Sequence, residues 1–220
     1  MFNNIDLNQL VVMMMALLLA VTVHEVAHGY VALRMGDNTA LKAGRLTLNP
    51  LKHLDFIGSF LLPLLLRLTG SPIIFGYAKP VPVNFANLRD RRKGTLYVAS
   101  AGVVANFVLA AASGMLYQFL LYMEHFWHAS IFKPVIVDAV YFLLFSVMIN
   151  LVLAIFNLIP VPPLDGGRIL AMVLPPSLRA QFAQIERFGM IIIIFLLVTN
   201  VIGSLIGFFL SPLANFFLGR

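Results

Sequence analysis

The sequence predicts an all-α polytopic membrane protein, a bundle of about four to six transmembrane helices with a re-entrant segment and a small membrane-associated β-hairpin or sheet. Hydrophobic residues make up 60% of the 220 residues and charged residues only 11%, a balance typical of chains that fold in lipid. Several apolar stretches approach the roughly 20 residues that a spanning helix needs. Clusters of proline and glycine between these stretches mark the points where helices end.

We expect one membrane-embedded domain over residues 1–220, because no polar block is long enough for a separate soluble domain. The first ten residues lack the basic region of a secretory signal, so we expect them to belong to the mature protein. Cysteine is absent, so any metal must be held by His, Asp or Glu. The net charge of +6 forms no basic stripe interleaved with aromatic residues, which argues against nucleic-acid binding.

The first apolar stretch, residues 10–33, is predicted to be a spanning helix. Its second half carries three ionisable side chains, which are rare and costly at that depth. The polar stretch that follows, residues 34–53, contains two short segments separated by turn-forming residues, at 39–42 and 45–48. This pattern predicts a small β-hairpin.

Residues 54–68 are apolar again, but the stretch is short for a span and contains Pro63, so we expect a broken or re-entrant helix. Residues 73–83 are rich in β-branched and aromatic residues, yet carry Pro80 and Pro82 two positions apart. Because proline confines such a run to the border of a sheet, we predict an edge strand or an extended segment.

A long span is predicted over residues 96–123 and another over residues 137–159. The second ends at residues 160–167, where three prolines and two glycines exclude a continuous helix. Residues 168–187 are predicted to form a short amphipathic helix interrupted by paired prolines, and residues 188–210 the last span.

The basic residues predict the orientation. Of the 15 Lys and Arg residues, 12 fall in residues 34–52, 79–93 and 168–187. All three stretches face the same side if residues 54–68 double back instead of crossing, which leaves four full crossings. The positive-inside rule then places this side in the cytoplasm and both termini outside it.

Residues His24-Glu25-Val26-Ala27-His28 fit the pattern H-E-x-x-H within the first predicted helix. With 3.6 residues per turn the two His side chains lie on one face and can reach one zinc ion. Glu25 is placed beside them to take a proton from water rather than to bind the metal. The alternative is a set of hydrogen bonds between helices. Ionisable groups inside a span are functional by default, which favours the metal site.

A catalytic zinc site needs three protein ligands and one open position. Five ionisable residues lie near the opposite face, in the polar loop or in the amphipathic stretch: Glu124, His125, His128, Asp138 and Glu186. Asp165 instead follows a span that ends on the side of the His pair, where prolines unwind the chain. Spacing alone leaves two roles open for Asp165, a zinc ligand or a turn former that caps the next helix.

The sequence resembles the site-2 protease family of intramembrane zinc metalloproteases, as a small bacterial-type member without PDZ or CBS domains. The H-E-x-x-H element resembles the zinc motif of the family, and residues 157–167 resemble its second motif, whose Asp is the third ligand. The resemblance implies that His24, His28 and Asp165 hold one Zn²⁺ ion. Glu25 would then be the catalytic base.

Residues 101–106, Ala-Gly-Val-Val-Ala-Asn, resemble the Gly-x-x-x-Asn element of the family, although Val103 stands where a Pro often follows the Gly. This implies that Asn106 binds the substrate by donating a hydrogen bond to its carbonyl group or to the developing oxyanion. The other role open to Asn106 is an interhelical hydrogen bond. His53 lies in a stretch similar to one in the smaller family members, and as a lone His we interpret it as structural.

The resemblance implies hydrolysis of peptide bonds within or near the transmembrane segment of a protein or peptide substrate. We expect an integral, multi-pass protein of a bacterial inner membrane, surrounded by the lipid bilayer, with its site toward the cytoplasm. The unwound substrate would pair as an added strand along residues 75–83. A metal or proton transporter is the alternative from another class, but the paired repeats of such transporters are not found in this sequence.

Overall fold

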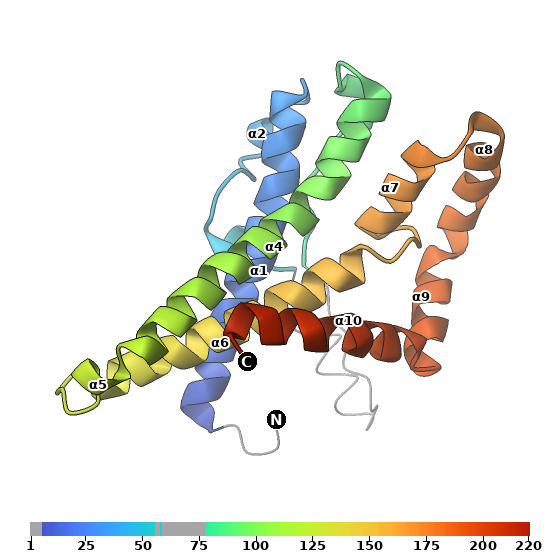
Figure 1. Ribbon diagram of the computed structural model, residues 1–220. Coiled ribbons are helices and arrows are strands. Elements are labelled where there is room, and N and C mark those ends of the chain that lie inside the picture. The colour runs from blue at the N-terminus through green and yellow to red at the C-terminus, as the bar shows by residue number, and fades with distance from the viewer. Residues whose placement is uncertain (1–5, 56–57, 59–77) are drawn as a thin grey trace.

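The computed structural model describes residues 6–55, 58 and 78–220, which form helices joined by turns and irregular segments (Figure 1). Its centre consists of three long helices, α1 (Leu7–Arg34), α4 (Arg91–Tyr122) and α6 (Lys133–Asn157). Each of the three packs against the other two. This three-helix centre places the second half of α1, with its ionisable side chains, against the first half of α4.

The two longest helices begin with ordinary caps. Asp6 precedes α1 and its side chain accepts a hydrogen bond from the N–H of Gln9. Asp90 precedes α4 and accepts one from the N–H of Lys93 in the same way. α1 ends where Gly36 adopts a φ of +112°, a backbone conformation that favours glycine.

Asp37 secures the turn after α1. Its buried carboxylate accepts hydrogen bonds from the backbone N–H and the hydroxyl group of Thr39, the backbone N–H of Asn84 and the side-chain amide of Asn87. These contacts start helix α2 (Thr39–Lys42) and tie it to the segment that precedes α4. One buried carboxylate therefore fixes how the chain returns from α1 to α4.

The predicted β-hairpin or sheet is wrong, because no strand occurs among the residues that the structure describes. Residues 39–42 form α2 and residues 45–48 are irregular. Asp37 starts a helical turn by accepting a hydrogen bond from the N–H of Thr39, the first residue of α2, and Arg45 donates one to the carbonyl oxygen of Lys79. Neither arrangement produces the alternating side-chain directions of a β-strand. The fold class is therefore corrected to all-helical over the described residues.

Two further expectations fall mostly on residues that the structure leaves undescribed. The predicted edge strand at 73–83 is described only from residue 78, and residues 78–83 have no regular structure. The predicted re-entrant helix at 54–68 is described only at residues 54, 55 and 58. Its path therefore lies outside the described residues.

The chain beyond α6 breaks where the sequence predicts. After α6 ends at Asn157, a proline-containing loop leads to α7 (Asp165–Val173), which packs against α4. Gly166 permits this tight return, because a Cβ atom there would lie only 2.2 Å from the carbonyl oxygen of Leu158. The loop thereby brings the first residue of α7 back to the three-helix centre.

The C-terminal region contains four more helical elements, α8 (Pro176–Ile185), η4 (Glu186–Phe188), α9 (Gly189–Val198) and α10 (Val201–Leu218). The single span predicted at residues 188–210 is divided at Asn200, whose left-handed φ of 58° turns the chain. α10 then crosses α6 (Figure 1), burying Ala214 and Leu218 in a core shared with α4 and α6.

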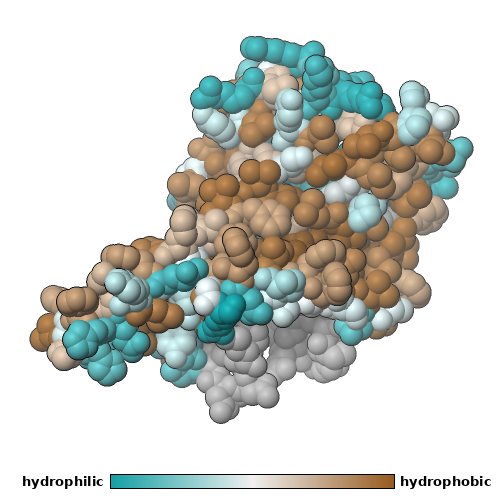
Figure 2. Space-filling model, viewed as in Figure 1, coloured by the Kyte–Doolittle hydropathy of each residue, from teal (hydrophilic) through white to brown (hydrophobic). Residues whose placement is uncertain are grey.

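Among the described residues, five helical stretches are long and apolar enough to cross a membrane: Leu7–Arg34, Arg91–Tyr122, Lys133–Asn157, Pro176–Val198 and Val201–Leu218. Figure 2 shows a broad belt of hydrophobic side chains between a hydrophilic upper end and a more polar lower edge. A belt of this kind is the surface that lipid covers. The chain is therefore a multi-pass membrane protein.

Candidate metal centre

His24 and His28 lie one turn apart on α1 and face α4. Their Nε2 atoms are 3.0 Å apart, and their rings are nearly perpendicular, with an interplanar angle of 87°. Gly102 of α4 makes room for both rings. A Cβ atom at this position would lie 2.5 Å from His24 Cε1 and 2.5 Å from His28 Nε2, so any side chain there would displace the imidazoles.

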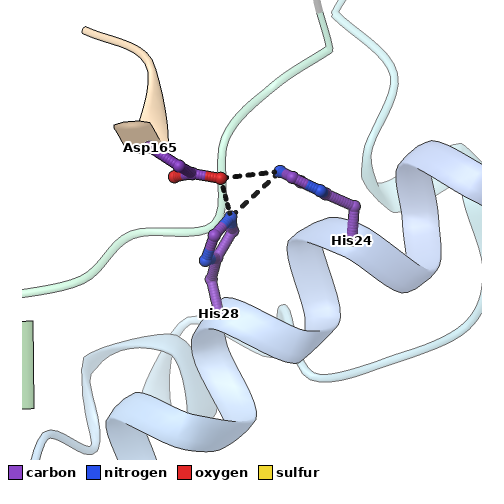
Figure 3. A group of neighbouring side chains, drawn as sticks. All are labelled: His24, His28 and Asp165. Carbon is purple, nitrogen blue, oxygen red and sulfur yellow. Dashed lines mark hydrogen bonds and ion pairs between the residues drawn. The ribbon is translucent and has the colours of Figure 1, made fainter. Parts of the chain in front are cut away.

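Asp165, the first residue of α7, completes the cluster (Figure 3). Its Oδ2 atom lies 3.4 Å from His24 Nε2 and 3.3 Å from His28 Nε2. Each of the three residues offers one ligand atom, and these atoms all lie within 4.8 Å of one another. The three side chains are only 9–12% exposed. The structure therefore brings together the three residues that we expected to hold a metal.

The second nitrogen of each imidazole ring is held by α4. His24 Nδ1 lies 2.6 Å from Asn106 Oδ1, and His28 Nδ1 lies 2.7 Å from the carbonyl oxygen of Val98. Both oxygens are acceptors, so each Nδ1 carries the proton and donates it. The lone pair of each neutral ring is consequently on Nε2, which points to the centre of the cluster.

Three acceptor atoms thus converge on one point, the Nε2 atoms of His24 and His28 and one carboxylate oxygen of Asp165. Within the described part of the chain, Asp165 Oδ2 is buried and has no hydrogen-bond partner. Buried acceptors that face one another without a donor are unfavourable, and a cation between them satisfies all three. Two His and one carboxylate form a ligand set of catalytic zinc sites that leaves one position open. The residues fit a zinc ion.

The charge state of Asp165 suits this role. Burial by itself would raise the pKa of this carboxyl group, but the hydrogen bonding and charge interaction with His24 and His28, when an imidazole is protonated, lower the pKa to about 2. The side chain is therefore an ionised carboxylate at neutral pH, as a metal ligand must be.

Glu25 lies beside the cluster and outside it. Its Oε2 atom accepts a hydrogen bond of 2.8 Å from the backbone N–H of Val81. Glu25 lines a cavity of about 300 Å³ that is also lined by His24, His28 and Asp165. The carboxylate can therefore exchange a proton with a molecule bound in the same cavity as the three ligand atoms.

Asn106 is fully buried and is not among the residues that line this cavity. Its Oδ1 accepts the hydrogen bond from His24, and its Nδ2 donates to Asn150 Oδ1 at 2.7 Å. Asn150 donates to Ser146, whose hydroxyl group lies 2.8 Å from that of Ser113. These contacts favour the interhelical role of Asn106, and its binding of substrate stays a prediction.

Sequence reasoning missed several groups that support the site. Ser146 and Asn150 stand four residues apart in the apolar second half of α6, and this spacing is a signal that could have identified them. The Val98 carbonyl and the Val81 N–H are backbone groups, which leave no trace in a sequence. His53 lies outside the cluster, is buried, and donates a hydrogen bond to a backbone carbonyl group, in keeping with a structural role.

Comparison with known proteins gives a consistent result. The sequence pattern of peptidase family M50 matches residues 12–199. The "Putative zinc metalloprotease YwhC" of Bacillus subtilis is 39% identical over 203 residues, which cover 92% of this chain and 85% of the relative. The "Putative zinc metalloprotease Rip2" of Mycolicibacterium smegmatis is 32% identical over 182 residues, covering 83% of this chain and 64% of that protein. No solved structure matches the chain.

Proposed function

The chain belongs to peptidase family M50, the site-2 protease family, and from this premise we propose that it is an intramembrane zinc metalloendopeptidase. The observation that carries the proposal is the convergence of His24, His28 and Asp165 on one point beside the carboxylate of Glu25, in a multi-pass membrane protein. The family supplies the zinc chemistry in general terms. The assignment of the zinc to His24, His28 and Asp165 comes from the resemblance to the family, and the geometry of the three side chains supports it.

In this proposal His24, His28 and Asp165 hold one zinc ion, and Glu25 is the catalytic base. A bound zinc ion supplies Lewis acidity, which polarises a carbonyl group and lowers the pKa of water. Glu25 takes the proton from the attacking water and passes it to the leaving amine. Asn106 keeps His24 in the tautomer that leaves Nε2 free.

The position of the site supports a substrate that is itself embedded in the membrane. His24 and Glu25 belong to a helix long and apolar enough to span the bilayer, so a peptide bond must reach them within or near it. A transmembrane helix must be unwound locally before its peptide bonds are accessible. We therefore infer that the substrates are the transmembrane segments of other proteins.

The proposal extends to the whole chain and its setting. Residues 1–220 act as one membrane-embedded domain, because α10 at the C-terminal end packs on the same α4 and α6 that hold α1. The basic residues that flank α1 and α4 favour a cytoplasmic location for that end of the molecule, in a bacterial inner membrane.

The decisive experiment compares loss of metal with loss of activity. His24→Ala, His28→Ala and Asp165→Ala should each lose zinc and cleavage together, because each removes one of three ligands. Glu25→Gln should keep near-stoichiometric zinc while cleavage falls by a factor of about 10² to 10⁴. Zinc is measured by mass spectrometry on detergent-solubilised protein, and cleavage with a model membrane substrate. Full zinc content in Asp165→Ala would remove Asp165 from the ligand set, and full activity in Glu25→Gln would refute the mechanism.

A further inference from the structure

Residues 78–83 pass along α1 and make one polar contact with the active-site face of that helix. The backbone N–H of Val81 donates a hydrogen bond of 2.8 Å to Glu25 Oε2. Val81 itself is 6% exposed and lines the cavity that contains the metal cluster. The donor is thus a backbone group of a buried residue.

The sequence around Val81 restricts what this segment can do. Pro80 and Pro82 have no N–H, so Val81 supplies the single backbone donor of the run Pro-Val-Pro. Pro82 also restricts Val81 to extended conformations. The backbone of Val81 therefore has few accessible conformations, and its N–H, the one donor of the run, points to Glu25.

The same segment is fastened at its start. The N–H of Lys79 donates to the carbonyl oxygen of His53 at 2.9 Å, and the buried guanidinium group of Arg45 donates to the carbonyl oxygen of Lys79 at 2.7 Å. Val81 also packs directly on α1, because a Cβ atom on Gly29 would lie 2.8 Å from Val81 Cγ1. Gly29 is one turn beyond Glu25, so the segment is in contact with α1 both at and after the carboxylate.

We propose that the run Pro80-Val81-Pro82 is a positioning element for Glu25, held in place through Lys79 by Arg45 and His53. The proposal rests on the function proposed above, in which Glu25 is the base. With Oε2 fixed by the Val81 N–H, the carboxylate keeps one orientation, and Oε1 is left to accept the proton of the attacking water. Residues 79–82 then act on catalysis through Glu25.

The test replaces the backbone N–H group of Val81 by an oxygen atom. Replacing the amide of Val81 by an ester, with the α-hydroxy analogue of valine introduced during translation, deletes the N–H and keeps the side chain. We expect kcat to fall about 10- to 100-fold, the effect of losing one hydrogen bond to a charged group. KM and zinc content should stay at the parent level. The matched control is the same change at Ala86, whose N–H donates to a side-chain oxygen of Asn84 and not to Glu25.

A second readout shows whether the N–H acts through Glu25. The ester at Val81 should lower the thermal unfolding temperature of the parent protein but not that of Glu25→Ala, where the acceptor is gone. An unchanged kcat, a zinc content that falls with kcat, or an equal drop in unfolding temperature in Glu25→Ala would each overturn the proposal. Failure of the proposed function would give a different result. Glu25→Gln would cleave at the parent rate, while the ester at Val81 would still lower the unfolding temperature of the parent and not that of Glu25→Ala.

Discussion

Asn106 determines which nitrogen of His24 is available to a metal. It is the one side chain of α4 that holds an imidazole of the cluster, and it is in turn fixed by Asn150 of α6. The Asn106 amide therefore connects α4 to α1 and α6, and through it the packing of these helices fixes the orientation of the His24 ring. Partners of this kind usually matter for metal affinity nearly as much as the ligands themselves.

Asn106→Leu should weaken zinc binding about 10- to 100-fold, because the Nδ1–H of His24 loses its acceptor and the ring can turn. The affinity can be measured by competition with a chromophoric chelator. Asn215→Leu on α10, which replaces an exposed asparagine, is the control and should bind zinc like the parent. A substrate-binding role for Asn106 predicts the opposite pattern, an intact zinc affinity with a raised KM.

Asp37 gives a pH dependence that does not involve the metal centre. Burial would raise the pKa of this carboxyl group, but hydrogen bonds from Thr39, Asn87 and the backbone of Asn84 outweigh it, and the pKa lies below its usual value. A carboxyl group with a lowered pKa stabilises the fold above its unfolded pKa of about 3.9. This contribution is lost as the pH falls from that value through the folded pKa.

Asp37→Asn should therefore remove part of the acid sensitivity of the protein. Thermal unfolding in detergent between neutral pH and pH of about 3 should show a smaller loss of stability in the variant than in the parent. At neutral pH the variant should be less stable, because the amide cannot accept all the hydrogen bonds that the carboxylate accepts. Parallel pH curves for the two proteins would contradict the assignment.

The packing of α4 against α1 depends on Gly102, and this gives a prediction at the scale of elements. Gly102→Ala would place a methyl group 2.5 Å from atoms of both imidazoles, so we expect loss of zinc although no ligand is changed. Gly207→Ala on α10 is the matched control, because a Cβ atom there has nothing within 4 Å. That variant should keep its zinc and unfold at an equal or higher temperature, since Ala is the better helix former. Parent-level zinc in Gly102→Ala would show that the two helices can separate.

Local sequence patterns predicted the parts of the site that depend on local geometry. The spacing of His24 and His28 determines their common face on any helix. The prolines and glycines at 160–167 determine a break after α6, and the structure has it there. Whether Asp165 would meet the two rings depends on how α7 packs against α4, which spacing could not determine. The family resemblance supplied that expectation.

The errors arose where a short polar segment could satisfy its backbone in more than one way. Residues 39–48 have the composition of a hairpin, yet Asp37 accepts the N–H of Thr39 at the start of a helical turn, and Arg45 binds the carbonyl oxygen of Lys79. The span predicted at 188–210 is largely apolar, and hydropathy cannot show that Asn200 adopts a left-handed φ. The partners Arg45 and Lys79 are 34 residues apart in sequence, so a local pattern cannot predict their contact.

At the scale of the whole molecule, the segment that follows α1 and the segment that precedes α4 lie at the same end of the structure. The N–H of Arg89 donates to the carbonyl oxygen of Met35, so the end of α1 and the start of α4 are adjacent. Figure 1 shows both at the upper end of the view, with α5 (Glu124–Trp127) and the start of α6 at the lower left. Basic residues are concentrated in the segments that follow α1 and lead into α4, residues 34–52 and 79–93, which agrees with this arrangement.

The orientation can be tested by labelling, because the chain contains no cysteine. α4 has 32 residues and is therefore about 48 Å long, more than the roughly 30 Å of the hydrocarbon core, so its two ends must emerge on opposite sides. Cysteine at Ala86, which is exposed just before α4, and at Lys133, at the start of α6, should react with a membrane-impermeant maleimide from different sides. The positive-inside rule assigns Ala86 to the cytoplasm, so in intact cells the reagent should modify only the Lys133→Cys variant. Modification of both variants in intact cells would refute the topology, and modification of Ala86→Cys alone would invert it.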